Sequence, residues 1–270
     1  MIQKLLKGFI AVGIAAMIFG QCISYSPFEI TLEDHEKDLT QKNLNRLLDN
    51  PTGNSDTVTF AFIGDTQRFY DASTDFVNVL NKRSDIEFVI HSGDISDFGL
   101  DLEFSLMAEI LGKLKVPYLT VIGNHDIIYN GRRIYEQMFG PMDYSFTYKG
   151  FRFVMLNTNG REFGFSGKVP DIPWLDEQLS DTSHYKNALV IQHVPPGNDD
   201  FDNTLETSYA QTLSKWGKTL LSMNGHNHDY SIGEPYNDGV TYLNSFSTSK
   251  KSYVVVKIWE GGFSHVVVDF

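Results

Sequence analysis

The stretch TVTFAFIGDTQ, residues 57–67, decides the fold that the sequence predicts. Its first seven residues are apolar or β-branched and predict a buried strand, Thr57–Ile63. The strand ends at Gly64, and two polar side chains, Asp65 and Gln67, follow in a loop. Such a strand, with an acid at its carboxyl end, is typical of the sites that α/β proteins build at a sheet edge.

The same order of strand, polar loop and helix recurs along the chain. Further strands are predicted over residues 87–91, 118–122, 144–148, 151–156, 188–192, 219–223, 240–244, 253–259 and 263–268. Helices are predicted over residues 76–83, 107–114, 132–139, 174–179 and 206–216. The pattern forms two halves that each end in antiparallel strands, and it predicts an α/β (α+β) fold in which two sheets pack as a sandwich with helices outside.

The composition fits a globular domain with an acidic surface. The chain has 270 residues, of which 41% are hydrophobic, and this is enough for one sizeable core. The formal net charge of −12 disfavours nucleic acids and anionic membranes as partners, because the average surface would repel both. A small phosphorylated substrate stays compatible with this charge if bound cations supply local positive charge.

The first residues predict an export signal. Lys4 and Lys7 precede an apolar run, Gly8–Phe19, that is too short to span a bilayer. We therefore expect residues 1–22 to be a signal peptide and the protein to be periplasmic or at the cell surface. The only cysteine, Cys22, follows the run, so two outcomes stay open: a lipid anchor on Cys22, or ordinary cleavage with an incidental cysteine.

A polar segment separates this signal from the first strand. Residues 23–56 predict a tether with one short helix, in which four leucines recur at helical spacing before Pro51. Residues 57–270 form the predicted domain. No cysteine follows residue 22, so a metal site in this domain must use oxygen and imidazole ligands.

The loops after successive strands carry a related set of polar groups. They are GDTQ at 64–67, GDISD at 93–97, GNHD at 123–126, QHVPP at 192–196 and GHNH at 225–228. Loops at the carboxyl ends of parallel strands converge on one edge, so residues far apart in sequence can share a site. Any one of these acids or histidines alone is more often a turn or core residue. Together the five loops predict a metal site.

In this order, the five motifs resemble those of the calcineurin-like metallophosphoesterases, over about residues 58–245. That family's pattern is D-x-H, G-D-x-x-D, G-N-H-D/E, a histidine after a strand, and G-H-x-H, and here only the first histidine is replaced, by Gln67. The resemblance implies a four-layer fold, a two-sheet sandwich flanked by helices. It also implies two divalent or trivalent metal ions, of Mn, Fe or Zn, that serve phosphoester hydrolysis.

The resemblance implies a role for each motif position. The implied metal ligands are Asp65, Gln67 and His228 at the first metal, Asn124, His193 and His226 at the second, and Asp94 between the two. The catalytic residues would be His125, beside the substrate, and Asp97, which would orient His125.

Such a site has a clear chemical logic. A bridging carboxylate holds two cations roughly 3.5–4 Å apart, so that they can contact both the attacking and the leaving oxygen. The cations lower the pKa of bound water, so a metal-activated hydroxide is the expected nucleophile. Protonated His125 would stabilise the developing charge or protonate the leaving oxygen, and such acid catalysis is typically worth about 10²–10⁴-fold.

Gln67 and several neighbours of the motifs carry further expectations. The Gln67 amide oxygen is a harder donor than imidazole and favours Mn²⁺ or Fe over Zn²⁺; alternatively, Gln67 bonds only to a metal-bound water. His91, inside a predicted strand, is expected either to be structural or to support a metal ligand. Four residues near the same edge are expected to line the substrate pocket: Arg68, Asn157, Asn159 and Arg161.

The sequence thus predicts an exported metal-dependent phosphohydrolase for a small phosphomonoester or phosphodiester, without choosing between these esters. Phe98 stands where the phosphoprotein phosphatases of the family carry an arginine, so a protein phosphatase is not expected. The alternative is a non-catalytic surface binding protein on the same scaffold, with Gln67 as the first step of site decay. A metal-dependent nuclease would need a basic groove, which the net charge disfavours.

Overall fold

A computed structural model describes residues 30–49, 51–52 and 56–270. The predicted signal peptide, with Cys22, and the first part of the tether lie outside these residues. The described strands are β1 (Thr57–Ile63), β2 (Phe88–His91), β3 (Tyr118–Thr120), β4 (Tyr144–Tyr148), β5 (Phe151–Met155), β6 (Asn187–Ile191), β7 (Thr219–Asn224), β8 (Ser231–Gly233), β9 (Thr241–Asn244), β10 (Ser252–Trp259) and β11 (Gly262–Asp269). The α-helices among these residues are α2 (Leu39–Asp49), α3 (Tyr70–Leu80), α4 (Asp101–Leu111), α5 (Gly131–Met138), α6 (Ile172–Ser180) and α7 (Glu206–Lys215). The described short 3₁₀ turns are η1 (Asp34–Glu36), η2 (His125–Ile127), η3 (Arg161–Phe163) and η4 (Thr248–Lys250).

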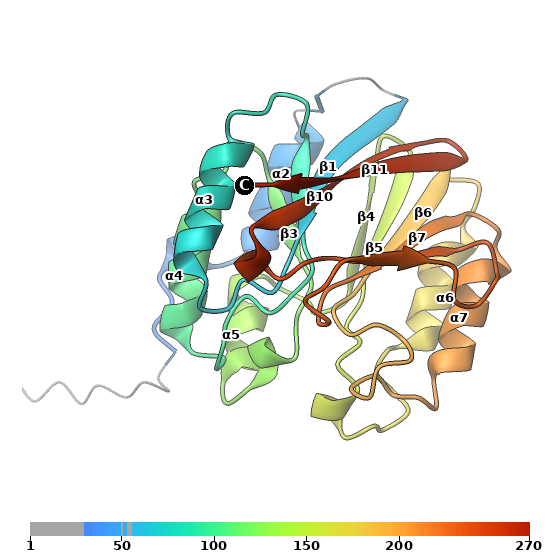
Figure 1. Ribbon diagram of the computed structural model, residues 1–270. Coiled ribbons are helices and arrows are strands. Elements are labelled where there is room, and N and C mark those ends of the chain that lie inside the picture. Colours follow the sequence, from blue (N-terminus) through green and yellow to red (C-terminus); the bar gives the residue numbers. More distant parts are fainter. Residues whose placement is uncertain (1–29, 50, 53–55) are drawn as a thin grey trace, which may run out of the picture.

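Two sheets form the centre of the described part of the molecule. One has the order β11-β10-β1-β2-β3 and the other β4-β5-β6-β7-β9-β8. β1 to β3 run parallel, as do β5, β6, β7 and β9. Figure 1 shows α3, α4 and α5 outside the first sheet and α6 and α7 outside the second. The predicted sandwich of two sheets flanked by helices is therefore confirmed.

The hairpins join the sheets in a way that the sequence pattern did not indicate. The β4–β5 hairpin, which ends the first half of the predicted pattern, belongs to the second sheet through the parallel pairing of β5 with β6. The β10–β11 hairpin, from the end of the chain, belongs to the first sheet, where β10 pairs with β1 antiparallel. Hydrophobic periodicity locates strands but does not indicate which strands pair. The sequence pattern therefore did not reveal to which sheet each hairpin belongs.

β1 shows how alternation builds the layers. Its side chains Phe60 and Phe62 lie in the core between the sheets, whereas Ala61 and Ile63 lie in the core between the first sheet and its helices. The Phe60 ring stacks on Phe88 with ring centroids 5.3 Å apart, so aromatic rings fill the space between the sheets. A strand buried on both faces fits the continuous apolar run in the sequence.

The segment before β1 packs onto the domain. Leu47 of α2 is buried in the core between the sheets, and Leu39 packs against the core under α3 and α4. The Asn43 side chain accepts a hydrogen bond from the Tyr118 amide at 3.2 Å, so α2 also covers the free edge of β3. Within the described residues, none of the helices has the length and apolar character needed to span a membrane.

Candidate metal centre

The predicted site residues meet where parallel strands of both sheets end. Their loops follow β1 (Asp65, Gln67), β2 (Asp94, Asp97), β3 (Asn124, His125), β6 (His193) and β7 (His226, His228). Backbone bonds fix neighbouring loops to one another. The Asp65 amide donates to the Gly93 carbonyl and the Gln67 amide to the Asp94 carbonyl, each at 3.0 Å. Convergence at one edge, which the sequence predicted, is therefore what the fold produces.

Four side chains form what we call the first cluster: Asp65, Gln67, Asp94 and His228. Asp65, Asp94 and His228 each offer a ligand atom, and these atoms all lie within 4.8 Å of one another. His228 Nε2 lies 3.3 Å from Asp65 Oδ1, and Gln67 Nε2 donates to Asp94 Oδ2 at 3.2 Å. A rotation of the Gln67 amide by 180° would present its oxygen to the same point.

The second cluster consists of Asp94, Asn124, His193 and His226. Asn124 Oδ1 lies 3.0 Å from His193 Nε2 and 3.1 Å from His226 Nδ1, and these two imidazole nitrogens are 3.3 Å apart. Three potential donor atoms on three different loops thus point at one small volume.

Asp94 belongs to both clusters. Its Oδ2 faces Gln67, while its Oδ1 lies 3.3 Å from His193 Nε2 and accepts the His125 amide hydrogen at 3.0 Å. The carboxylate is buried, with about 1% of the residue exposed. One oxygen toward each cluster is the arrangement that a carboxylate shared by two cations requires.

The donor set fits a pair of metal ions. All side chains of the two clusters offer carboxylate oxygen, amide oxygen or imidazole nitrogen, which together suit Mn, Fe and Zn. Asp65 and Asp94 are buried acids without a nearby lysine or arginine among their described contacts, and histidines are their partners instead. Cations between these groups would offset the cost of burying two carboxylates close together.

His125 stands beside the clusters without joining either. Its Nδ1 lies 2.8 Å from the backbone carbonyl oxygen of Asp97 and 3.6 Å from the Asp97 carboxylate. A carbonyl can only accept, so Nδ1 carries the hydrogen in this contact. Asp97 therefore orients His125 mainly through its backbone, and its carboxylate binds Arg68 Nη1 at 2.6 Å.

The backbone of the site is held in uncommon conformations. Positive φ angles occur at Asp65 (50°), Gln67 (35°), Asp94 (57°), His226 (72°) and His228 (61°). Such strain at non-glycine residues clusters at functional sites. Gly93 has φ 93°, and a Cβ atom there would lie 2.8 Å from the Gly123 amide nitrogen and 2.9 Å from His193 Nδ1. Glycine at this position lets the β2 and β3 loops approach closely enough to share Asp94.

The charged groups of the two clusters shift one another's pKa values. Burial alone would lower the pKa of His193, but the Asp94 and Asp65 carboxylates raise it to about 10. Burial would likewise raise the pKa of Asp94, and the facing His193 lowers it to about 2. Burial, reinforced by His193, lowers the pKa of His226 to about 4. Bound metal ions would take over the positive charge that His193 supplies here.

Two of the four expected pocket residues do not line a pocket. Asn157 and Asn159 are buried, with about 2% and 0% exposed. The Asn159 side chain donates to the Ile122 carbonyl at 3.0 Å and to Asn157 Oδ1 at 2.8 Å, so both asparagines brace the loop after β5 against the β3 loop. The expectation was wrong because position near a sheet edge does not tell whether a side chain faces inward.

The Asn157 amide donates to Asp143 Oδ1 at 2.6 Å, and this contact leads to a prediction about pH. Burial raises the pKa of Asp143 to about 6. A carboxyl group with a raised pKa in the fold stabilises it fully below its unfolded pKa, and this contribution is lost as pH rises through about 6. We expect Asp143→Asn, which keeps the acceptor, to equal the wild type near pH 4 and to be more stable by about 1–2 kcal/mol at pH 7.

Urea unfolding of both proteins at pH 4, 5, 6 and 7 measures this difference. Asp181→Asn is a matched control, because Asp181 is exposed and its pKa is lowered by a hydrogen bond to His184. A stability difference between Asp143→Asn and wild type that stays constant with pH would contradict the prediction.

His91 and Asp126 support the site without facing the clusters. His91 is fully buried, lies 3.0 Å from Thr66 Oγ1 through Nε2 and accepts the Gly93 amide hydrogen through Nδ1 at 3.2 Å. Its expected structural role fits these contacts. Asp126 accepts hydrogen bonds from the Ser96 amide at 2.8 Å and the Gly123 amide at 2.9 Å, so it ties the β2 loop to the β3 loop.

Sequence reasoning missed Asp200. This residue lies in the loop after His193, 3.4 Å from His226 Nε2, and forms an ion pair with Arg161. Arg161 and Arg68 have similar surroundings. Arg68 pairs with Asp97, which contacts His125, and Arg161 pairs with Asp200, which contacts His226. Both arginine side chains are more than half exposed. In the sequence, Asp200 is one of several acids that follow His193. Acids in such a loop are usually solvated, so nothing in the sequence singled out Asp200.

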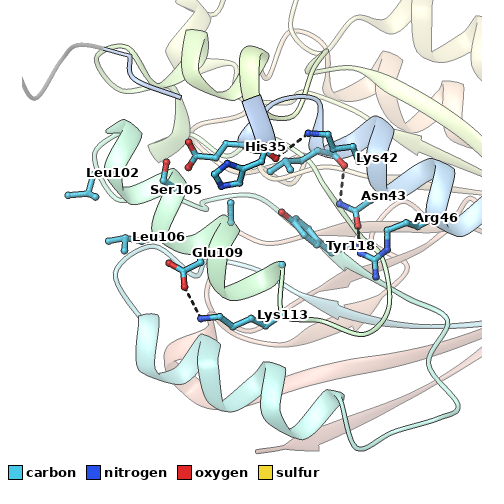
Figure 2. A pocket seen from close by; sticks show the side chains of 14 residues that line it. His35, Lys42, Asn43, Arg46, Leu102, Ser105, Leu106, Glu109, Lys113 and Tyr118 are labelled. Atoms are coloured by element: carbon cyan, nitrogen blue, oxygen red, sulfur yellow. Dashed lines mark hydrogen bonds and ion pairs between the residues drawn. The ribbon is translucent and has the colours of Figure 1, made fainter. Parts of the chain in front are cut away.

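The molecule also has a cavity of about 670 Å³ away from this centre. It lies between the η1–α2 segment and α4. The residues that line it include Leu102, Leu106, Tyr118, Lys42 and Arg46 (Figure 2). No residue of either cluster lines it.

Comparison with known proteins identifies the family. The model of the calcineurin-like phosphoesterase family matches residues 58–247, and the chain belongs to this family. The fold agrees: a dimetal phosphatase from Danio rerio superposes with a TM-score of 0.64 at 15% identity, over 78% of this chain and 98% of that one. The chain thus belongs to the calcineurin-like phosphoesterase family and shares the fold of this dimetal phosphatase.

Relatives with similar sequences carry phosphodiesterase names. A protein of Arcobacter nitrofigilis, named a probable glycerophosphodiester phosphodiesterase, is 29% identical over 57% of this chain and 60% of its own length. A protein of Xenorhabdus bovienii, named a probable cyclic nucleotide phosphodiesterase, is 21% identical over 74% of this chain and 85% of its own length. The chain spans as little as 15% of the length of another relative, from Bacillus subtilis.

Proposed function

We propose that this metallophosphoesterase hydrolyses a small phosphodiester with two metal ions held by the two clusters. The observation that carries the proposal is Asp94, whose two carboxylate oxygens face different clusters. The phosphodiesterase names of the relatives support a diester over a monoester. The acidic surface supports a small substrate over a nucleic acid, because repulsion would oppose a long polyanion.

Each cluster would hold one ion. Asp65, Gln67 and His228 would bind the first, Asn124, His193 and His226 the second, and Asp94 both. When bound, the ions supply Lewis acidity and activate water at neutral pH. His125 would face the substrate through Nε2, because Asp97 occupies Nδ1, and would donate its proton to the leaving oxygen. Arg68, fixed by Asp97, would attract the anionic substrate from the rim.

A direct experiment tests the proposal. Purified residues 30–270 would be stripped of metal, reloaded with Mn²⁺, Fe²⁺ or Zn²⁺, counted for metal per chain, and assayed on chromogenic phosphomonoesters and phosphodiesters. Two metals per chain and turnover of the diester are expected. Two bound metals without turnover of either ester would instead favour a non-catalytic binding protein.

Gln67 allows a prediction about metal preference. Its amide replaces an imidazole, a stronger ligand for late first-row metals. Gln67→His is expected to bind Zn²⁺ at the first cluster more tightly, by about tenfold as an order of magnitude, and to retain turnover. Competitive titration with a chromophoric chelator measures the affinity. Gln192→His, in a buried residue bonded to Ser222 outside the clusters, is the control. Unchanged Zn²⁺ affinity in Gln67→His would indicate that Gln67 does not face the ion.

We also propose that the protein is exported, on the basis of the charged and apolar pattern before Cys22. A lipid on Cys22 would leave the wild type in the membrane fraction and release Cys22→Ser into the soluble fraction. Equal distribution of both forms would indicate simple cleavage. Fractionation of cells that express both forms distinguishes these outcomes.

A further inference from the structure

The loop after β6 touches the GHNH turn at two points. Asn198 Nδ2 donates to Asn227 Oδ1 at 3.1 Å. Two residues further on, Asp200 Oδ2 lies 3.4 Å from His226 Nε2. Asp200 is buried, with about 8% exposed, although neither the family motifs nor the composition of the loop singles it out. Burying a carboxylate is costly, so the contact of Asp200 with His226 indicates a role for this acid in the site.

The orientation of the His226 ring explains why an acid at this place matters. Nδ1 faces Asn124 Oδ1 at 3.1 Å and His193 Nε2 at 3.3 Å, in the volume of the second cluster. For Nδ1 to act as a ligand, its lone pair must be free, so the ring hydrogen must sit on Nε2. A carboxylate beside Nε2 stabilises that tautomer and makes the imidazole a stronger donor.

Arg161 holds Asp200 in place. The guanidinium pairs with Asp200 Oδ1, the oxygen that does not face His226, and the Arg161 amide donates to the Asp200 carbonyl at 3.0 Å. The neighbouring Gly160 packs so tightly that a Cβ atom there would lie 2.5 Å from the Asp202 amide nitrogen. The loops after β5 and β6 are thus locked together, and Asp200 cannot swing away from His226 without breaking these contacts.

We propose that Asp200 is a positioning residue of the second metal site, which keeps the hydrogen of His226 on Nε2 and aims Nδ1 at the ion, with Arg161 as its anchor. This inference rests on the proposed function in that the second cluster must bind a metal. With this role for Asp200, two histidines of the site are held in the same way. Arg68 and Asp97 hold His125, and Arg161 and Asp200 hold His226.

The experiment compares three variants with the wild type. Asp200→Ala removes the carboxylate, Asp200→Asn keeps an acceptor without the charge, and Asp199→Ala changes the exposed neighbouring acid as a matched control. Metal-free protein is titrated calorimetrically with Mn²⁺. We expect one of the two Mn²⁺ affinities to fall about 10–100-fold in Asp200→Ala and less in Asp200→Asn, with the other affinity unchanged. Asp199→Ala should match the wild type.

A second measurement separates positioning from general damage. Long-range ¹H–¹⁵N spectra of the metal-free proteins report which nitrogen of His226 carries the hydrogen. We expect Nε2 in the wild type and a mixture in Asp200→Ala. Arg161→Gln, which loosens the anchor but leaves the acid, should lower the same Mn²⁺ affinity to a smaller extent.

Two results would overturn the inference: two Mn²⁺ affinities in Asp200→Ala that both lie within twofold of the wild type, or an unchanged His226 tautomer. An equal loss at both equivalents would also count against it, because it would indicate a general disturbance of the fold. Neither the Mn²⁺ titration nor the His226 spectra depend on turnover. A wild type that binds two Mn²⁺ but cleaves no ester would therefore contradict the proposed function, while the titration and the spectra still decide the role of Asp200.

Discussion

His125→Asn is expected to lower kcat on a phosphodiester by about 10²–10⁴-fold, the usual contribution of a positioned general acid. Asp97 fixes the ring through Nδ1, so Nε2 is the nitrogen that can reach a substrate. His125 belongs to neither cluster, so its side chain should be dispensable for metal binding. The loss should be smaller for substrates with better leaving groups, because these need less help from an acid.

The assay compares kcat for an activated and an unactivated diester, with metal content measured on the same samples. His184→Asn is the matched control, since His184 is a largely exposed histidine that belongs to neither cluster. A variant that keeps two metals and a kcat within about threefold of the wild type on both substrates would show that His125 is not the acid.

Glu87→Ala is expected to destabilise the fold by about 3–5 kcal/mol, the range measured when one partner of a buried ion pair is removed. The Glu87 and Lys149 side chains are each only 8% exposed, and their charged groups are in contact. Glu87 also accepts hydrogen bonds from the Thr59 amide at 3.0 Å and the Tyr148 hydroxyl at 2.9 Å. Removal of the carboxylate therefore leaves the buried Lys149 ammonium with backbone carbonyl partners but no counter-charge, and it removes the acceptor of the Thr59 amide and the Tyr148 hydroxyl.

Urea unfolding at pH 7 measures the loss of stability. Glu109→Ala is the control, because the Glu109–Lys113 pair is exposed on α4 and such pairs contribute only about 0.3–0.5 kcal/mol. Glu87→Gln should fall between the two, since it keeps the acceptor oxygen without the charge. A loss below about 1 kcal/mol in Glu87→Ala would indicate that water enters and solvates Lys149.

The fold could be predicted from the sequence to the extent that local pattern determines it. The β1 run and its loop indicated a parallel sheet with a site at its edge, because a strand buried on both faces cannot alternate with polar residues. β8, three exposed residues, gave no hydrophobic signal. The placement of β10 beside β1 depends on pairing between residues almost 200 positions apart, and local pattern carries no information about it.

The candidate site was more predictable than the fold around it, because each motif combines a turn residue with a donor at a strand end. Asp65, Asp94 and His228 came together as the spacing indicated. Asp200 and Arg161 did not stand out, because their roles arise from contact between two irregular loops. Asn157 and Asn159 were wrongly expected to line the substrate pocket. A polar residue in a loop can brace the backbone as well as face a ligand, and the sequence does not distinguish the two.

The pairing of β10 with β1 has a consequence for how the protein matures. β1 lies between β2 and β10, so the strand that presents Asp65 lacks one of its two neighbours until residues 252–259 have left the ribosome. Ser247 and Thr248, just before β10, also bond to the backbone of Asp65 and Gly64. Residues 247–259 must therefore leave the ribosome before the loop that carries Asp65 has all its backbone partners, so the first cluster is assembled only after β10 has been synthesised.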